Sequence, residues 1–351
     1  MEFLTHFNQQ ITKTIIIMKN IYKKFGIALA FSSVLLTATS CETSSSYEDE
    51  LPSIANIAVS NDAFSTLEAA AINGGVAGVL SNSNPNDASG DYTVFAPNNS
   101  AFARLGLDES TLGVLQTPFL TNTLLYHVSN GNLPSSAIAA DGTSASALGG
   151  LTRRFINRDG SLFINGSKII ATDITAENGT VHVIDKVMIA TGGNVVESAI
   201  ALQSASVFKT PELSYLVEAV VFAGLADALS NPAAKFTVFA PNDQAFINLG
   251  AALGLTFDEP SDVRMIDKDL LTAVLLNHVF ADTSKDSFTS ELNAGSYDAL
   301  GDDNIRLGAY NNGVLTVSGS GNGTPANMVI PDVQTTNGIV HVIDQVLLPV
   351  L

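Results

Sequence analysis

An internal repeat constrains the fold of this chain more than any other feature of its sequence. The segment TVFAPNNSAF at residues 93–102 returns as TVFAPNDQAF at residues 237–246, with eight of the ten positions identical. LLYHV at residues 124–128 returns as LLNHV at 275–279, and NGTVHVID at 178–185 returns as NGIVHVID at 337–344. Three blocks that recur in the same order indicate a duplicated domain of about 140 residues.

The spacing of the blocks shows where the two copies differ in length. The offset between copies rises from 144 to 151 to 159 residues along the chain, so the second copy carries two insertions. The first insertion must lie between Phe246 and His278, where residues 254–267 read as a polar loop. The second must lie between His278 and His341, among strands rich in glycine and asparagine.

The first block predicts a strand followed by a capped helix. TVFA is a short apolar strand that stops at Pro97 in one copy and at Pro241 in the other, because proline cannot donate to a β-ladder. Asn98 and Asn242 come next, and an asparagine side chain in this position can cap the helix that follows.

The other blocks predict a helix and then a run of strands. The LLxHV block ends an amphipathic helix that begins near Thr117 in the first copy and near Asp267 in the second. Asn-Gly is a hairpin-turn signal, and the VHVID run that follows it is a β-rich strand. Runs at residues 161–166 and 313–317 are further strands between turns. Helices precede a β-meander in each copy, so the predicted class is α+β.

Together the three blocks resemble the first motif, the central segment and the last motif of the fasciclin domain. The resemblance covers residues 52–190 and residues 195–349, and the second copy departs from it at Asn277, where the first has Tyr126. It implies two tandem domains, each a β-sandwich wedge flanked by helices, and extracellular adhesion to matrix or neighbouring cells. The motif residues are Pro97, Asn98, His127, His182, Asp185, Pro241, Asn242, His278, His341 and Asp344.

The N-terminus has the pattern of an export signal. Lys19, Lys23 and Lys24 precede an apolar run at residues 25–36, and small polar residues then lead to Cys41. A basic start, a short apolar core and small residues before a cleavage point are typical of a signal peptide. The apolar run is shorter than the roughly 20 residues of a spanning helix, which disfavours a transmembrane anchor.

Met18 gives this signal a normal length. We therefore expect residues 1–17 to be an upstream extension and residues 18–40 to be the signal peptide. Their removal takes away four lysines and one glutamate, so the formal charge changes from −18 to −21. A chain this acidic should be repelled by phosphate polymers and by anionic membrane surfaces. Only 16 Lys and Arg side chains and no Trp also argue against nucleic-acid binding.

Cys41 is the only cysteine, and its position resembles the lipobox of bacterial lipoproteins. In that family the chain is cut before the cysteine and the thiol is diacylated, which implies attachment to a membrane through Cys41. Ala38 stands where the family prefers leucine. The alternative is a plain secretory signal followed by an incidental cysteine.

Residues 41–51 form a polar tether with an acidic cluster at residues 48–50. Such a segment has too little apolar area to order itself. It resembles the acidic signals that send lipoproteins to the cell surface in Bacteroidetes, and a plain spacer is the alternative. The expected location is the bacterial cell envelope, at the outer membrane and facing the cell surface.

Histidine is the residue that most often marks a catalytic or metal site, and four of the five histidines lie in the repeated blocks. His182 and Asp185 are three residues apart on a predicted strand, as are His341 and Asp344, so each pair points to opposite faces. Two histidines without a third ligand make a poor zinc site. We therefore expect buried neutral histidines that tie helix to strand, with no metal and no cofactor.

The sequence predicts a binding protein rather than an enzyme. It has no Gly-x-Ser-x-Gly elbow and no phosphate-binding loop, and carboxylate pairs such as Asp302 and Asp303 lie in turns. The leading hypothesis is a surface adhesion module for an extracellular protein or glycan. The alternatives are a glycan-binding accessory lipoprotein for polysaccharide capture, which seven Tyr and no Trp disfavour, and a structural envelope spacer.

Overall fold

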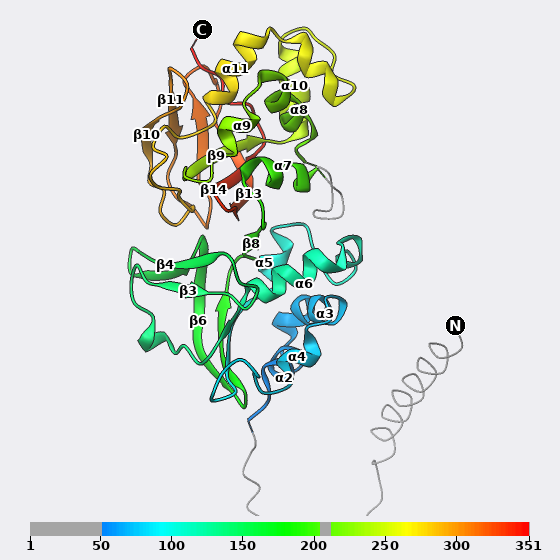
Figure 1. The fold of residues 1–351 in the computed structure, drawn as a ribbon, viewed down its shortest axis with the longest axis vertical. Coiled ribbons are helices and arrows are strands. Elements are labelled where there is room, and N and C mark those ends of the chain that lie inside the picture. Colours follow the sequence, from blue (N-terminus) through cyan, green and yellow to red (C-terminus); the bar gives the residue numbers. More distant parts are fainter. Residues whose placement is uncertain (1–50, 204–211, 351) are drawn as a thin grey trace, which may run out of the picture. The chain divides into compact units, whose positions relative to one another are not determined.

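The computed structural model describes residues 51–203 and 212–350, which form two domains of the same design (Figure 1). The predictions of an extension at 1–17, a signal peptide at 18–40 and a tether from Cys41 to residue 50 fall outside the described residues. In the two described stretches, no helix is both long and apolar enough to cross a membrane.

Domain 1 places most of its helices before its strands. The helices are α2 (Ile54–Val59), α3 (Ser65–Asn73), α4 (Ala77–Leu80), α5 (Asn99–Ala103) and α6 (Thr117–Tyr126), with 3₁₀ helices at Asp62–Phe64, Leu112–Val114 and Ser135–Ala137. The strands are β1 (Tyr92–Pro97), β2 (Val128–Asn130), β3 (Thr143–Ala145), β4 (Thr152–Arg158), β5 (Ser161–Ile164), β6 (Ser167–Ala176), β7 (Gly179–Ile184) and β8 (Ile189–Ala190).

Domain 2 repeats this order. The helices are α7 (Val195–Leu202), α8 (Ser214–Ala223), α9 (Ala226–Leu229), α10 (Asp243–Ala252) and α11 (Lys268–Leu276), with a 3₁₀ helix at Pro260–Met265. The strands are β9 (Phe236–Pro241), β10 (Gly295–Asp298), β11 (Asn304–Leu307), β12 (Thr316–Gly319), β13 (Ala326–Gln334) and β14 (Gly338–Ile343). The α+β class is confirmed, and the helices that end at His127 and His278 begin where the sequence predicted.

Each domain has one sheet path with a parallel pair inside it. The order is β2-β1-β7-β6-β5-β4-β3 in domain 1 and β10-β11-β12-β13-β14-β9 in domain 2. β1 runs parallel to β7 and β9 runs parallel to β14, while the strands along the rest of each path pair antiparallel. The β-meander was predicted, but the return of the last strand to the side of the first was not.

The parallel pair is buried on both faces. Every residue of β1 and β7 is buried. Val94 packs in a cluster with Ile54 of α2, whereas Phe95 packs on the other side with Phe155 of β4. A strand covered on both faces has no solvent-facing positions, which explains why the TVFA segment is apolar without alternation.

The first insertion is more structured than a polar loop. The sequence predicted a loop at residues 254–267, but these residues contain the 3₁₀ helix Pro260–Met265. Val263 and Ile266 are buried in the main apolar cluster of domain 2, which stabilises this segment against the helices. The second insertion lies between β12 and β13, where residues 320–325 replace the tight turn between β5 and β6.

Candidate functional site: the motif residues and the domain junction

The first motif in each domain positions a helix cap. Asn98 accepts a hydrogen bond from the backbone N–H of Ala101 at 2.9 Å, and Asn242 accepts one from Ala245 at 2.9 Å. Pro97 and Pro241 are the last residues of β1 and β9. These residues therefore shape the turn from strand to helix, as the sequence indicated.

We expect Asn98→Ala to lower the free energy of unfolding by about 1 kcal/mol, because one N–H at the start of α5 loses its partner. Urea unfolding measures the change. Asn98→Asp should retain most of the stability, and Ser100→Ala, at an exposed position in the same turn, should change it by less than about 0.5 kcal/mol. A loss of equal size in Ser100→Ala would contradict the assignment.

The central motif buries a histidine at the end of a helix. His127 donates from Nδ1 to the carbonyl of Thr123 at 2.7 Å, and its Nε2 accepts the backbone N–H of Met188 at 2.9 Å. His278 makes the same two bonds, with Val274 and Leu347, at 2.7 Å each. Burial lowers the pKa of both histidines to about 4, so both rings are neutral at neutral pH.

The last motif buries a second histidine, on the strand. His182 donates from Nε2 to the carbonyl of Leu133 at 2.9 Å, and its Nδ1 accepts the backbone N–H of Asp173 at 3.3 Å. His341 repeats this arrangement, with bonds of 3.1 Å to Ser287 and 3.2 Å to Asp332. Burial lowers the pKa of His341, and the nearby Asp332 carboxylate only partly opposes that effect.

The motif aspartates bind a different strand from the histidines. Asp185 accepts the backbone N–H of Lys168 at 2.7 Å, and Asp344 accepts that of Asn327 at 2.7 Å. Each histidine and each aspartate therefore fixes one backbone segment of its own domain. Within the stretches that the structure covers, no three His, Cys, Asp or Glu side chains gather as metal ligands would.

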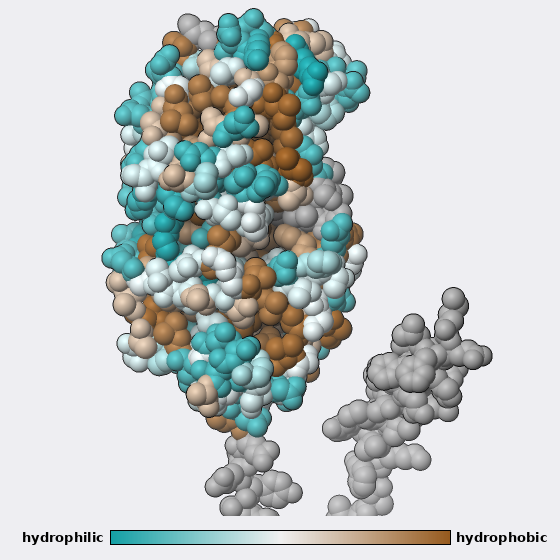
Figure 2. Space-filling model, in the orientation of Figure 1, coloured by the Kyte–Doolittle hydropathy of each residue, from teal (hydrophilic) through white to brown (hydrophobic). Residues whose placement is uncertain are grey.

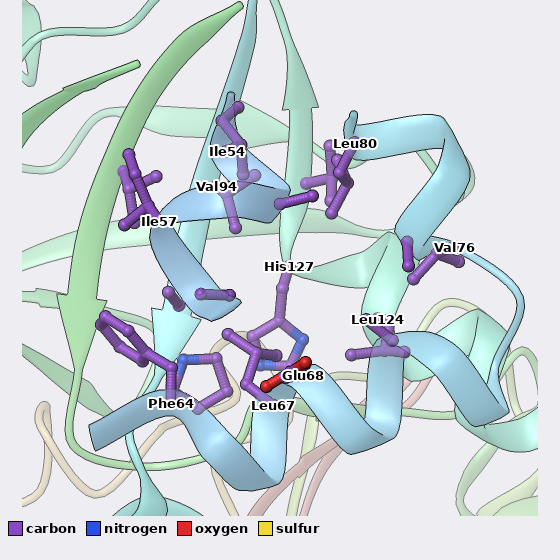
Figure 3. Close-up of a pocket in the computed structure, with 18 of the residues that line it drawn as sticks. Ile54, Ile57, Phe64, Leu67, Glu68, Val76, Leu80, Val94, Leu124 and His127 are labelled. Carbon is purple, nitrogen blue, oxygen red and sulfur yellow. The ribbon is translucent and has the colours of Figure 1, made fainter. Parts of the chain in front are cut away.

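Each domain has an apolar pocket between its first helices and its sheet. The pocket of domain 1 has a volume of about 80 Å³, and Figure 3 shows Ile57, Leu67, Leu80 and Val94 around it, with His127 also against it. The pocket of domain 2, with His278 at the same position, has about 50 Å³. Since both nitrogens of each ring already bind backbone groups, these pockets offer no ring nitrogen to a polar ligand. Figure 2 shows apolar side chains reaching the surface over the helices of both domains.

The richest constellation of charged groups is the junction between the domains, which sequence reasoning missed. Lys186 donates from Nζ to Asp332 at 2.5 Å, to the carbonyl of Gly313 at 2.9 Å and to the hydroxyl of Thr289 at 3.0 Å. Both charged side chains are less than 10% exposed. A Cβ on Gly166 would overlap the Asp332 carboxylate, so the β5–β6 turn needs a glycine here.

Two arginines of β4 complete the junction. Arg154 pairs with Asp286 at 2.7 Å and with Glu291 at 2.9 Å. Arg158 lies over the ring of Tyr310, 4.1 Å from its centre. Stacked and paired guanidinium groups of this kind fix the orientation of one surface on another.

Tyr126 of the central motif also reaches across the junction. Its hydroxyl donates to Gln334 of domain 2 and accepts from Asn165 at 2.9 Å, and burial raises its pKa to about 12. The counterpart Asn277 is 1% exposed and its amide has no hydrogen-bond partner within the described part of the chain. The departure from the motif therefore coincides with the end of domain 2 that no following domain of this chain contacts.

The profile of the fasciclin domain matches the sequence twice, over residues 62–190 and 211–349. The chain belongs to the fasciclin-domain family. Its two domains are tandem fasciclin domains, so the resemblance of the three motifs is confirmed.

Several curated proteins are similar to this fasciclin chain. Protein sll1483 of Synechocystis is 33% identical over 171 residues, which is 47% of this chain and 91% of that protein. Protein sll1735 of Synechocystis is 34% identical over 139 residues, 40% of this chain and 98% of that protein. Human periostin is 28% identical over 270 residues, 74% of this chain but 28% of periostin.

One solved structure is a pair of fasciclin domains from the insect cell adhesion molecule fasciclin I. It is 21% identical in sequence, with a TM-score of 0.36, and the match covers 74% of this chain and 88% of that one.

Proposed function

We propose that this chain is a non-catalytic adhesion protein of the bacterial envelope, which uses its two fasciclin domains to bind an extracellular protein or glycan. Fasciclin domains occur in cell-adhesion proteins, and this chain consists of two of them over most of its length. The lipid anchor at Cys41 and display at the outer membrane are part of the proposal, and the signal and lipobox patterns support them.

The observation that carries the proposal is the use of the motif histidines. All four have both ring nitrogens in hydrogen bonds to backbone atoms. A general base needs a free nitrogen within reach of substrate. The repeated residues therefore build the fold, and variable surface residues around them are left to bind a partner.

Binding assays with the chain from residue 42 onwards test adhesion. We expect saturable binding to at least one member of a panel of matrix proteins, purified envelope polymers and intact cells. The controls are the same chain after thermal unfolding and an unrelated protein of similar size and net charge. Binding confined to a sugar array would favour the glycan-capture alternative. The absence of binding across the panel would contradict adhesion, and an altered envelope in a deletion strain with normal adhesion would favour a spacer.

Metabolic labelling tests the anchor. Palmitate should label the wild-type chain and leave Cys41→Ala unlabelled, because Cys41 is the only cysteine. Protease added to intact cells should remove the wild-type protein if it faces outward. Equal labelling of both forms would refute lipidation at Cys41, and full protection from protease would refute surface display.

A further inference from the structure

The junction buries one particular end of domain 1. Three of its side chains, Leu105, Phe119 and Ile189, pack against the main apolar cluster of domain 2. Leu105 follows α5, Phe119 lies on α6, and Ile189 lies in β8, which runs parallel to β13 of domain 2. This end of domain 1 is therefore covered by domain 2.

The same end of domain 2 carries an open apolar groove. Leu249, Leu270 and Leu348 stand 144, 151 and 159 residues after the three junction residues of domain 1, which are the offsets of the repeated blocks. All three line a groove of about 460 Å³, which also includes Leu253 and Val350, 49% and 71% exposed. We call these five residues the end groove. It is the counterpart of the surface that domain 2 covers on domain 1.

The two insertions of the second copy add to the walls of this groove. Ile266 belongs to the first insertion and Gly321 to the second, and both line it. An exposed apolar hollow of this kind on a soluble domain marks an interaction surface.

The surface of domain 2 that receives domain 1 is also repeated. β13 changes register before Val333, and Asp332 there has a φ of 67° and accepts the N–H of Thr289 at 2.6 Å. β6 of domain 1 changes register at the same place, where Asp173 has a φ of 60° and accepts the N–H of Ser135 at 2.8 Å. The two receiving surfaces are therefore built alike.

The receiving surface of domain 1 is exposed. In the junction, Val329 of β13 lines a cavity together with Leu105 and Ile189. Its counterpart in β6 is Ile170, which is 48% exposed, and Asp173 beside it is exposed too. We call Ser135, Ile170 and Asp173 the β6 face.

The charges of the two free surfaces have changed together. Gln345 stands in the end of domain 2 where domain 1 has Lys186, and Asn132 and Ala137 stand where domain 2 has the two carboxylates that bind Arg154. Cations are thus lost from one surface and anions from the other, so neither side would bury an unpaired charge against the other.

We propose that the end groove of one chain binds the β6 face of a second copy, in the arrangement that the two domains adopt within the chain. Ile170 of the second copy fills the groove between Leu249 and Leu348, and the amide of Gln345 donates to Asp173. The contact joins different surfaces, so it continues from chain to chain instead of closing into a dimer.

Sedimentation of the chain from residue 42 onwards, between about 5 and about 500 µM, tests this association. We expect mass to increase with concentration beyond the dimer. Added salt should strengthen the association, because it screens the repulsion between chains of net charge near −21 without weakening apolar contact. A monomer throughout this range, or a dimer that does not grow, would overturn the proposal.

Two variants locate the surfaces. Leu253→Glu places a charge in the end groove and Ile170→Glu places one on the β6 face, and each should be monomeric alone. Because each variant keeps one intact surface, a mixture of the two should form pairs and nothing larger. Val221→Glu, at a position of domain 2 that is 55% exposed and outside the groove, is the matched control and should associate like the wild type. Association that survives in both variants, or is lost in the control, would overturn the assignment of these surfaces.

Discussion

Replacement of Lys186 by methionine is expected to lower the free energy of unfolding by about 3–5 kcal/mol. The ammonium binds Asp332, Thr289 and Gly313 across the domain junction, where both charged side chains are nearly excluded from water. Methionine has a similar volume but no charge, so the variant leaves the Asp332 carboxylate buried without its cation. Urea unfolding at neutral pH measures the change.

The charge state of Asp332 determines the pH range of this prediction. Burial opposes ionisation of Asp332, but the Lys186 ammonium beside it and the hydrogen bonds it accepts hold its pKa below the ordinary value of 3.8. A carboxyl group with a lowered pKa contributes stability above its unfolded pKa and loses it as pH falls through the folded value. The effect of Lys186→Met should therefore be complete at pH 7 and should shrink only below about pH 4.

Two further variants separate the charge pair from general packing. Lys186→Met combined with Asp332→Asn removes both charges, and it should be more stable than Lys186→Met alone because no unpaired ion stays buried. Asparagine tolerates the φ of 67° at this position. Lys168→Met is the matched control, since Lys168 is half-buried but takes part in no ion pair within the described stretches. Equal losses in Lys186→Met and Lys168→Met would contradict a special role for the junction pair.

The sequence predicted best what is local or repeated. The caps at Asn98 and Asn242, the starts of α6 and α11 and the location of the second insertion follow from short-range patterns and from the spacing of the blocks. A side chain that bonds within three or four residues leaves its signal in the sequence beside it.

The junction left no such signal. Lys186 follows the motif residue Asp185 and has the sequence context of a surface lysine, while its partner Asp332 lies 146 residues further on. Gly166 in an Asn-Gly turn is typical of any hairpin, and its contact with Asp332 depends on the placement of two whole domains. The misjudged insertion has a similar cause, because Val263 and Ile266 are spaced irregularly and become buried only against distant helices.

The second large effect is expected from the buried histidines when the pH falls. His127 and His278 have a pKa of about 4 in the folded chain, against 6.5 in the unfolded chain, and burial is the main cause of the shift. The unfolded chain therefore takes up protons between pH 6.5 and pH 4 that the folded chain refuses. Stability is complete above pH 6.5 and falls as the pH drops through this window.

The expected loss is large for a protein of ordinary stability. A shift of one pKa unit corresponds to about 1.4 kcal/mol, so each histidine should remove about 3 kcal/mol between pH 7 and pH 4. Both together approach the whole free energy of unfolding of a typical domain. Urea unfolding at several pH values between 5 and 7 should therefore show a steep decline before the carboxyl groups begin to titrate.

A variant of one histidine identifies the source of this slope. His278→Gln cannot titrate, so the decline in unfolding free energy should become shallower by about 1.4 kcal/mol per pH unit near pH 5, whatever stability the variant has at pH 7. Asn277→Ala is the control, because it removes a neighbouring buried polar group that does not titrate. It should lower or raise the whole curve and leave the slope unchanged. If His278→Gln keeps the wild-type slope, protonation of this ring does not drive acid unfolding, and the buried neutral state of His278 that follows from its two backbone hydrogen bonds is wrong.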